Sequence, residues 1–322
     1  MEYRRLQKSK GGSFLISIPK EWVMKNKLDS GSILKIVESE GGSLIISVEG
    51  EELESQTSFI KEEENLEKQI RTHYLMGADI IVIDLKTKIT PMIRERVKEA
   101  ISKLIGLEIV EEGTNTITIQ CLLQPTSMPL INILKRAYSL AASMHKDAEE
   151  ALLNNDIERA EIVIKRDEEV DRLYFLIVRQ LRSAVRNQRL AEKLGIKVVE
   201  CLDLRMAAKY IESIADYSEG IAKNVRKIYG EKINYEIMDG LKELSKTAYL
   251  LHYDAINALF KRDVKIANKV IEKNKELVDK MISVNELLSN KQQKFSTILN
   301  TVAMYMYNIG ECGIDLAELV GY

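Results

Sequence analysis

The spacing of apolar residues changes twice along the chain, and each change marks a different kind of fold. In the first 50 residues the apolar runs are short and separated by glycine-containing turns, a pattern typical of small β-strands. We expect strands at 3–7, 14–18, 33–37 and 44–48, and a short helix at 20–27. A unit of this size buries little apolar surface alone, so it is expected to dimerise.

The next stretch alternates between strand and helix patterns. Helical periodicity covers 66–76, and a second helix opens at Thr90 and Pro91, with proline at a first helical position, and runs to about Ile105. Runs typical of strands fall at 78–85, 109–110 and 116–123. The sequence therefore predicts a small α/β domain at 51–125, behind an N-terminal domain at 1–50.

From residue 126 to residue 322 the pattern is helical throughout. Apolar positions recur every three or four residues, and no proline follows Pro129. Five breaks divide this region into six expected helices; they fall near 154–155, 187–195, 229–230, 261–262 and 289–290.

The helical region also repeats itself at an offset of 107 residues. The pattern His145-x-Asp147 returns as His252-x-Asp254, and further identities keep the same offset as far as Ile164. We therefore expect two copies of a three-helix unit, at 127–230 and 235–322. The fold class predicted for the chain is multidomain: a small β domain, a small α/β domain and an all-helical pair of three-helix bundles.

Composition narrows the class of protein. The 322 residues are 45% hydrophobic and 30% charged, an ordinary balance for a globular protein. No apolar run reaches the roughly 20 residues that span a bilayer, so no membrane insertion is expected. The three cysteines are far apart, which argues against a disulfide framework and favours the cytoplasm.

Charge is distributed unevenly although the whole chain carries a net charge of only −2. Between Arg4 and Lys27 there are seven basic residues and one acidic residue. Such a patch either neutralises phosphates of a nucleic acid or is simply a solvated face. The candidate DNA-binding residues are Arg4, Arg5, Lys8, Lys10, Ser13 and Lys20.

Acidic residues in the first helical copy form two pairs at i, i+4 spacing, which places each pair on one helix face. The second copy has a weaker set. Carboxylates gathered on facing helices can hold metal ions, whereas isolated acids merely solvate a helix. The candidate metal ligands are Asp167, Asp171, Glu212 and Asp216 in the first copy, and Asp279, Glu311 and Asp315 in the second.

The repeated histidines have two interpretations: His145 and His252 could bind a metal or could be packing residues with one hydrogen bond each. Catalytic patterns are missing, since the sequence contains no G-x-S-x-G, H-E-x-x-H or Walker A motif. Cys201 and Cys312 lie in helical stretches and are expected to be buried thiols. We therefore do not expect an enzyme.

The N-terminal segment resembles the AbrB/SpoVT/MazE family. The residues that carry the resemblance are 10–23, KGGSFLISIPKEWV, followed by Leu28 and Gly31. The resemblance implies a swapped-hairpin dimer that binds DNA through basic residues near the first strand and its turn. Carried over by position, these are Arg4, Arg5, Lys8 and Lys10.

Residues 127–322 resemble the PhoU family of phosphate-uptake regulators. The residues that carry this resemblance are Asp156, Ala160, Asp167, Val170, Asp171, Arg205, Glu212, Ile214, Asp216, Ile221 and Ala222. The resemblance implies two three-helix bundles, a multinuclear cluster of iron or zinc (magnesium as an alternative) on the acids, and control of the phosphate ABC transporter.

Together these patterns predict a phosphate-responsive transcriptional regulator that binds DNA as a homodimer or higher homo-oligomer. One alternative is an adaptor that binds the ATPase of the phosphate ABC transporter, with the AbrB-like domain serving only dimerisation. A second is a phosphate-handling enzyme that uses the carboxylate site.

Overall fold

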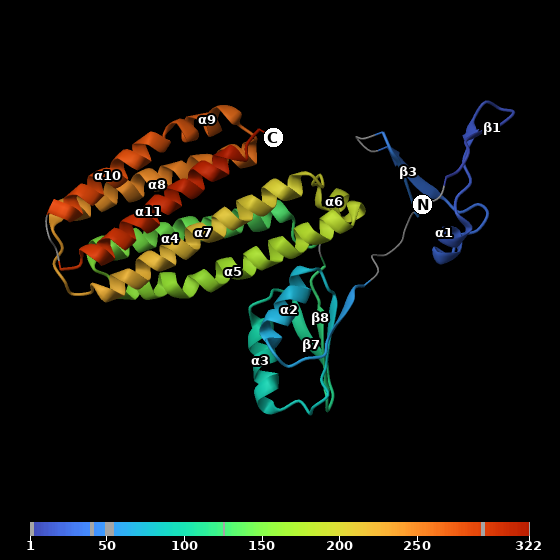
Figure 1. Cartoon of the computed structure of the whole chain (residues 1–322), viewed down its shortest axis with the longest axis horizontal. Coiled ribbons are helices and arrows are strands. Elements are labelled where there is room, and N and C mark those ends of the chain that lie inside the picture. The colour runs from blue at the N-terminus through green and yellow to red at the C-terminus, as the bar shows by residue number, and fades with distance from the viewer. Residues whose placement is uncertain (1–2, 39–41, 49–54, 125, 291–293, 322) are drawn as a thin grey trace. The chain divides into compact units, whose positions relative to one another are not determined.

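The computed structural model describes residues 3–38, 42–48, 55–124, 126–290 and 294–321. The chain divides into two compact units, Met1–Glu54 and Ser55–Tyr322. Figure 1 shows the small β unit in blue and the larger unit in cyan to red. The α/β segment and the helices thus pack together as one unit, so each of the two units is described by itself.

The N-terminal unit is made of two hairpins and one helix. Strand β1 (Gln7–Lys8) pairs antiparallel with β2 (Phe14–Leu15), and β3 (Leu34–Glu38) pairs antiparallel with β4 (Leu44–Val48). Helix α1 (Lys20–Lys25) lies between the hairpins in sequence. The first two strands have two residues each and are shorter than predicted, whereas β3 and β4 have five residues each. The sequence also predicts a hairpin turn at Gly41 and Gly42, between the strands at 33–37 and 44–48, and residue 41 lies outside the described residues.

This unit lacks a core of its own. None of its described residues is buried, and apolar side chains such as Phe14 (62% exposed) and Ile33 (71% exposed) face outward. The hydrophobic effect gives such a surface a strong tendency to pair with another surface.

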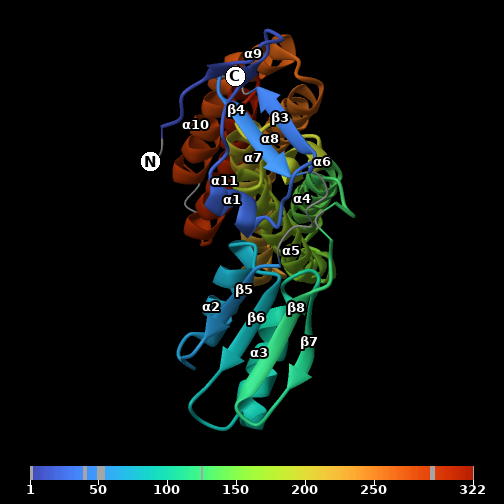
Figure 2. The ribbon, with the colours of Figure 1, turned by 90° about the vertical axis from the view of Figure 1, so that its right-hand side faces the viewer.

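The second unit begins with the α/β domain. It contains β5 (Thr57–Ile60), α2 (Leu66–Leu75), β6 (Ile80–Asp84), α3 (Pro91–Ser102), β7 (Leu107–Glu112) and β8 (Thr116–Cys121). The sheet order is β5-β6-β8-β7, with β5 parallel to β6 and the other neighbours antiparallel. Figures 1 and 2 show α2 and α3 on one face of the sheet.

In this domain the local sequence predicts the start of α3 but does not predict strand β5. The Thr90 hydroxyl accepts a hydrogen bond from the Ile93 amide at 3.3 Å, which caps α3 as Thr90-Pro91 predicted. Strand β5 was not predicted. Its four residues, between acid-rich segments, are too few for a clear period, and pairing with β6 is what makes them a strand.

The helical region contains eight helices among the described residues, not the six predicted. They are α4 (Leu130–Asn154), α5 (Ile157–Arg186), α6 (Gln188–Leu194), α7 (Glu200–Lys227), α8 (Tyr235–Lys261), α9 (Val264–Glu272), α10 (Asn274–Asn290) and α11 (Ser296–Glu318). Helices α4, α5 and α7 pack together, α8 to α11 form a second group, and contacts of α7 with α11 and α4 with α8 join the two groups.

Two local features account for the extra helices. The segment predicted as a break holds α6, which Asn187 caps by accepting from the Leu190 amide and which ends at Gly195 with φ of 70°. The second bundle has a break at Lys273, which splits its middle helix into α9 and α10.

The repeat is visible in the turns. Asn155 and Arg262, 107 residues apart, end α4 and α8 with φ of 53° and 54°. The next residue in each copy, Asp156 or Asp263, caps the following helix with its carboxylate. A left-handed residue followed by an aspartate cap is thus the turn used in both bundles.

A buried arginine fixes the α/β domain to the bundle. Arg179 on α5 is 5% exposed and donates hydrogen bonds to the carbonyl oxygens of Tyr74 at 3.0 Å and Ala78 at 2.7 Å. The same guanidinium pairs with the Asp79 carboxylate at 2.8 Å. Nearby, Arg186 donates to the Met76 carbonyl. The positive side chains therefore lie at the carbonyl end of α2, where the helix dipole favours them.

Candidate functional site

An acidic cluster lies between α5 and α7, the most closely packed pair of helices in the first bundle. Asp171, Glu212 and Asp216 each place one carboxylate oxygen so that the three oxygens lie within 4.8 Å of one another. The predicted i, i+4 pair on α7 thus meets one acid of the pair on α5. Asp167, one helical turn earlier, lies outside this group but close enough to influence it.

The cluster changes the titration of its members. Burial, and then repulsion from Asp171, raises the pKa of Asp167 to about 7. Burial and the Glu212 carboxylate raise the pKa of Asp216 to about 6. For Asp171, burial and Asp216 raise the pKa, while Lys209 and Arg71 partly offset the increase. Ionising all the acids of this site at once is therefore unfavourable unless a cation is bound among them.

Two charged residues that the sequence analysis did not single out belong to this site. The Lys209 ammonium bonds to Glu212 and lies 3.9 Å from Asp216. Glu219 is close enough to raise the pKa of Asp167 and Asp216. Both lie on the α7 face of the predicted pair, three residues before Glu212 and three after Asp216, so helical spacing could have found them.

The ligand atoms are all carboxylate oxygens. Such a set suits magnesium, manganese or ferrous iron, whereas the closed structural sites of zinc use mainly histidine and cysteine. Three oxygens leave further coordination positions for water or a partner group. The residues present therefore fit a divalent cation.

The second bundle does not gather its acids in the same way. Within the part of the chain that the structure describes, Asp279, Glu311 and Asp315 do not belong to any group of three closely spaced ligands. Asp279 is exposed on α10, and one carboxylate oxygen of Glu311 is buried with no hydrogen-bond partner among the described residues. Asn274 stands where the first copy has Asp167.

The repeated histidines are packing residues. Both are fully buried, and burial lowers the pKa of His145 to about 3 and that of His252 well below its usual value. Nδ1 of His145 lies 3.1 Å from Nε2 of His252, and the two remaining ring nitrogens meet Ser245 and Tyr138 at 3.0 Å. Every ring nitrogen is engaged, so no lone pair is left for a metal.

The direction of each hydrogen bond in this series of side chains follows from the one that Ser245 makes to Glu149. Ser245 donates to the Glu149 carboxylate at 2.6 Å, so its oxygen must accept from His145 Nε2. His145 Nδ1 then accepts from His252 Nε2, whose Nδ1 accepts from Tyr138. One directional chain of hydrogen bonds thus joins α4 and α8 across the two copies.

The predicted DNA-binding residues are all on the surface of the N-terminal unit. Arg4 and Arg5 precede β1, Lys8 lies on β1, and Lys10 lies in the turn to β2. The Ser13 hydroxyl lies 2.7 Å from the Ser9 hydroxyl, which closes this turn, and Lys20 is the first residue of α1. All six are exposed.

Comparison with models of protein families gives two matches. Residues 134–225 match the family described as the PhoU domain. The chain contains a PhoU domain. Residues 7–53 match a second family, described as "Antidote-toxin recognition MazE, bacterial antitoxin". The recognition of a PhoU-type chain with an AbrB/MazE-like N-terminus is therefore confirmed, together with the multidomain fold class.

Solved structures agree with the PhoU domain match. The crystal structure of PhoU from Pseudomonas aeruginosa is 19% identical with a TM-score of 0.53; the alignment covers 59% of this chain and 93% of that one. The structure titled phosphate transport system regulatory protein PhoU from Streptococcus pneumoniae is 16% identical with a TM-score of 0.52, over 59% and 91% of the two chains. At these identities the likeness shows a shared fold. No curated protein matches the sequence.

The PhoU domain match spans the first bundle and stops before the second. It contains all four acids predicted on α5 and α7, from Asp167 to Asp216. The second bundle, in which the acids are dispersed, lies outside it. Among the described helices none is long and apolar enough to cross a membrane.

Proposed function

We propose that this PhoU-domain protein regulates phosphate transport by binding DNA through its N-terminal unit. The observation that carries the proposal is that all six candidate contacts, in a segment with seven basic residues and one acid, lie exposed on a MazE-like unit. A basic surface of this kind neutralises backbone phosphates and releases counterions. The role proposed for the helical domain is to sense phosphate status, as a regulator rather than an enzyme.

The same unit is proposed to act as a homodimer. Because none of its described side chains is buried, a single copy has little free energy available for folding. Pairing two copies would cover exposed residues such as Phe14 and Ile33 and would place two basic segments on one surface.

Binding to DNA from the promoters of phosphate-transport genes, measured by fluorescence anisotropy across a range of salt concentrations, tests the proposal. We expect affinity to fall with salt, and Lys10→Ala to weaken binding and flatten the log–log salt slope by about 0.9 for each phosphate that the variant no longer neutralises. Arg5→Ala is expected to act in the same direction. Lys98→Ala, on α3, is the matched control. Parental affinity and slope in both N-terminal variants would exclude this surface as the DNA-binding surface.

We further propose that the acidic cluster binds a divalent cation, since three carboxylate oxygens converge within 4.8 Å. In this proposal Lys209 is the tethered cation that the metal displaces. Calorimetric titration with Mn²⁺ should show binding that Asp216→Asn removes, whereas Lys209→Gln should tighten it because the competing ammonium is gone. Lys103→Gln, which affects an exposed pair with Glu99 on α3, is the control. Unchanged affinity in Asp216→Asn would argue against the site.

A second candidate function is an adaptor that contacts protein rather than DNA. The description of the matched MazE family refers to recognition of a toxin, which is a protein contact. The name of the Streptococcus pneumoniae relative refers to a phosphate transport system. Co-purification with the ATPase of the phosphate ABC transporter, together with no DNA binding at low salt, would favour this function.

A further inference from the structure

One face of the α/β sheet has no helix over it among the described residues of its own unit. Alternate residues of the strands point to α2 and α3 and are buried, among them Ile60, Ile81 and Ile117. The residues between them point the other way, and Figure 2 shows this side of the sheet toward the viewer, with no helix of the same unit in front of the strands.

The strand register defines the side chains of this open face. Phe59 pairs with Val82, Val82 with Thr118, and Thr118 with Glu111 on β7. These residues form one row of side chains across the sheet, and Ile80 lies in the neighbouring row on the same face. Phe59 is 59% exposed and Val110 is 48% exposed. The centre of the face is therefore β-branched, with Val82 beside Thr118, and the polar residues Asp84, Thr116 and Gln120 follow on the same two strands. Glu111 lies on the outer strand β7. A β-branched face of this kind can pack against another sheet.

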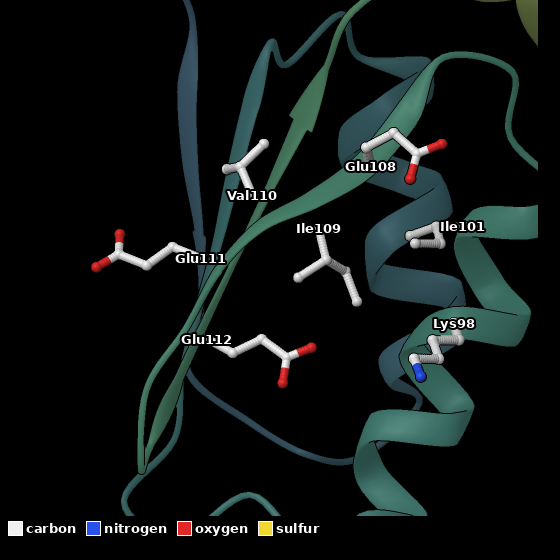
Figure 3. Close-up of a pocket in the computed structure, with 7 residues that line it drawn as sticks. All are labelled: Lys98, Ile101, Glu108, Ile109, Val110, Glu111 and Glu112. Atoms are coloured by element: carbon white, nitrogen blue, oxygen red, sulfur yellow. The ribbon is translucent and has the colours of Figure 1, made fainter.

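A bulge in β7 extends this face. The register shifts between Ile109 and Glu111, so Val110 is the extra residue. In Figure 3, Ile109 and Glu112 point toward α3, whereas Val110 and Glu111 point to the opposite side. The bulge thus adds an apolar side chain to the open face at a strand that otherwise carries glutamates.

The size of the face indicates what can cover it. Four strands at about 4.8 Å spacing and about five residues of about 3.3 Å rise give roughly 300 Å² on each partner. A stable interface needs about 800 Å² on each partner. This face is therefore too small to hold a free partner, but it suffices for one that another contact already keeps nearby.

A second copy of this chain meets that condition. Only residues 49–56 separate β4 from β5, and eight residues span at most about 28 Å. If the N-terminal units dimerise, both β5 strands start within that reach of the dimer, and the effective concentration of one sheet at the other is on the order of millimolar.

We infer that the open face, defined by Phe59, Ile80, Val82, Val110 and Thr118, packs against the same face of a second copy in the dimer. The inference rests on the homodimer of the proposed function. Two identical faces pack about a two-fold axis, which brings the central strands β6 and β8 of the two copies together.

Cross-linking of the full-length protein tests this contact. Thr118→Cys, on central strand β8, is placed in a Cys121→Ser background and treated with a short bismaleimide. Covalent dimer is expected in most of the protein, and Phe59→Glu should reduce it at least tenfold. Val82→Cys on β6 repeats the measurement independently of any effect at Thr118.

Two controls use the helix side of the same domain. Glu99→Cys on α3 should not cross-link, and Met92→Glu, which charges an exposed methionine of α3, should leave the Thr118→Cys cross-link unchanged. Light scattering reports the dimer separately. A dimer in which neither cysteine cross-links overturns the contact while leaving the N-terminal dimer intact, and a monomer overturns both. A cysteine that is protected from a monofunctional maleimide but does not cross-link would show that another segment covers the face, which also overturns the inference.

Discussion

Asp167 is the residue at which the acidic cluster most affects stability. Its pKa of about 7 in the folded protein exceeds the usual value of about 3.9, because burial and neighbouring carboxylates disfavour the charged form. Between these two values the folded state holds a proton that the unfolded state has lost. The free energy of unfolding should therefore fall as the pH rises from 4 to 7, and this contribution should stay constant above 7.

Asp167→Asn removes this titration. In protein treated with a chelator, we expect the variant to be more stable than the parent at pH 8 and no more stable at pH 4, measured by urea unfolding. Glu168→Gln changes an exposed acid one position further along α5 and serves as the control. An equal effect of Asp167→Asn at both pH values would show that its stability effect does not come from the carboxylate charge.

Helical spacing predicted part of this cluster from the sequence. Two acids four residues apart must share a helix face, so the pairs 167/171 and 212/216 could be proposed without a structure. The sequence did not reveal that Asp171, rather than Asp167, meets the α7 pair, because that depends on how α5 is rotated and shifted against α7. The roles of Asp279, Glu311 and Asp315 stay predictions.

At the scale of elements, one chain of hydrogen bonds joins the two bundles. Ser245 on α8 accepts from His145 on α4 and donates to Glu149 on α4, and its side chain is fully buried. A buried donor that loses its partner keeps the cost of its desolvation, about 1–3 kcal/mol. The stability of the contact between α4 and α8 should therefore depend on the Ser245 hydroxyl.

Ser245→Ala leaves the His145 Nε2 proton without an acceptor, so we expect a loss of about 1–3 kcal/mol in the free energy of unfolding, measured in urea. Ser283→Ala is the matched control, since that hydroxyl is exposed and bonds only to the Asp279 carbonyl of its own helix. It should change stability by less than about 0.5 kcal/mol. If the two variants were equally stable, the histidine chain would not stabilise the interface.

Element boundaries were predicted where a side chain fixes them and missed where packing does. Thr90-Pro91 and the residues after 154 and 261 mark helix ends through their own caps, so the sequence revealed them. Strand β5 depends on its pairing with β6. No proline or glycine marks the break between α9 and α10. Both follow from contacts made by the folded chain.

At the scale of the whole molecule, the sequence predicted the order of domains but not how the α/β domain is held. The repeat and the change from short apolar runs to helical periodicity separated the three regions. Nothing in that pattern distinguishes Arg179 from other arginines of α5. Its role appears only when the carbonyl end of α2 is placed against it, which makes one compact unit of residues 55–322.

Arg179 lies eight residues, or about 12 Å of helix, beyond Asp171. One rigid helix therefore carries both an acid of the cluster and the attachment of the α/β domain. A cation that draws α5 toward α7 would act on the same helix that holds this domain. The cluster and the α/β domain thus share helix α5, and Arg71 on α2 also acts on Asp171 electrostatically.

Arg179→Leu tests that attachment. It leaves the carbonyl oxygens of Tyr74 and Ala78 and the Asp79 carboxylate without their partner, at a cost of about 3 kcal/mol. We expect faster hydrogen exchange in α2 and β6, with little change in α8 and α11, because only the attachment is removed. Arg182→Leu removes an exposed neighbour that donates to the Met76 sulfur, and this variant should exchange like the parent. If Arg179→Leu left exchange in α2 unchanged, then Arg186 and the apolar packing of Phe175 would suffice to hold the α/β domain to the bundle.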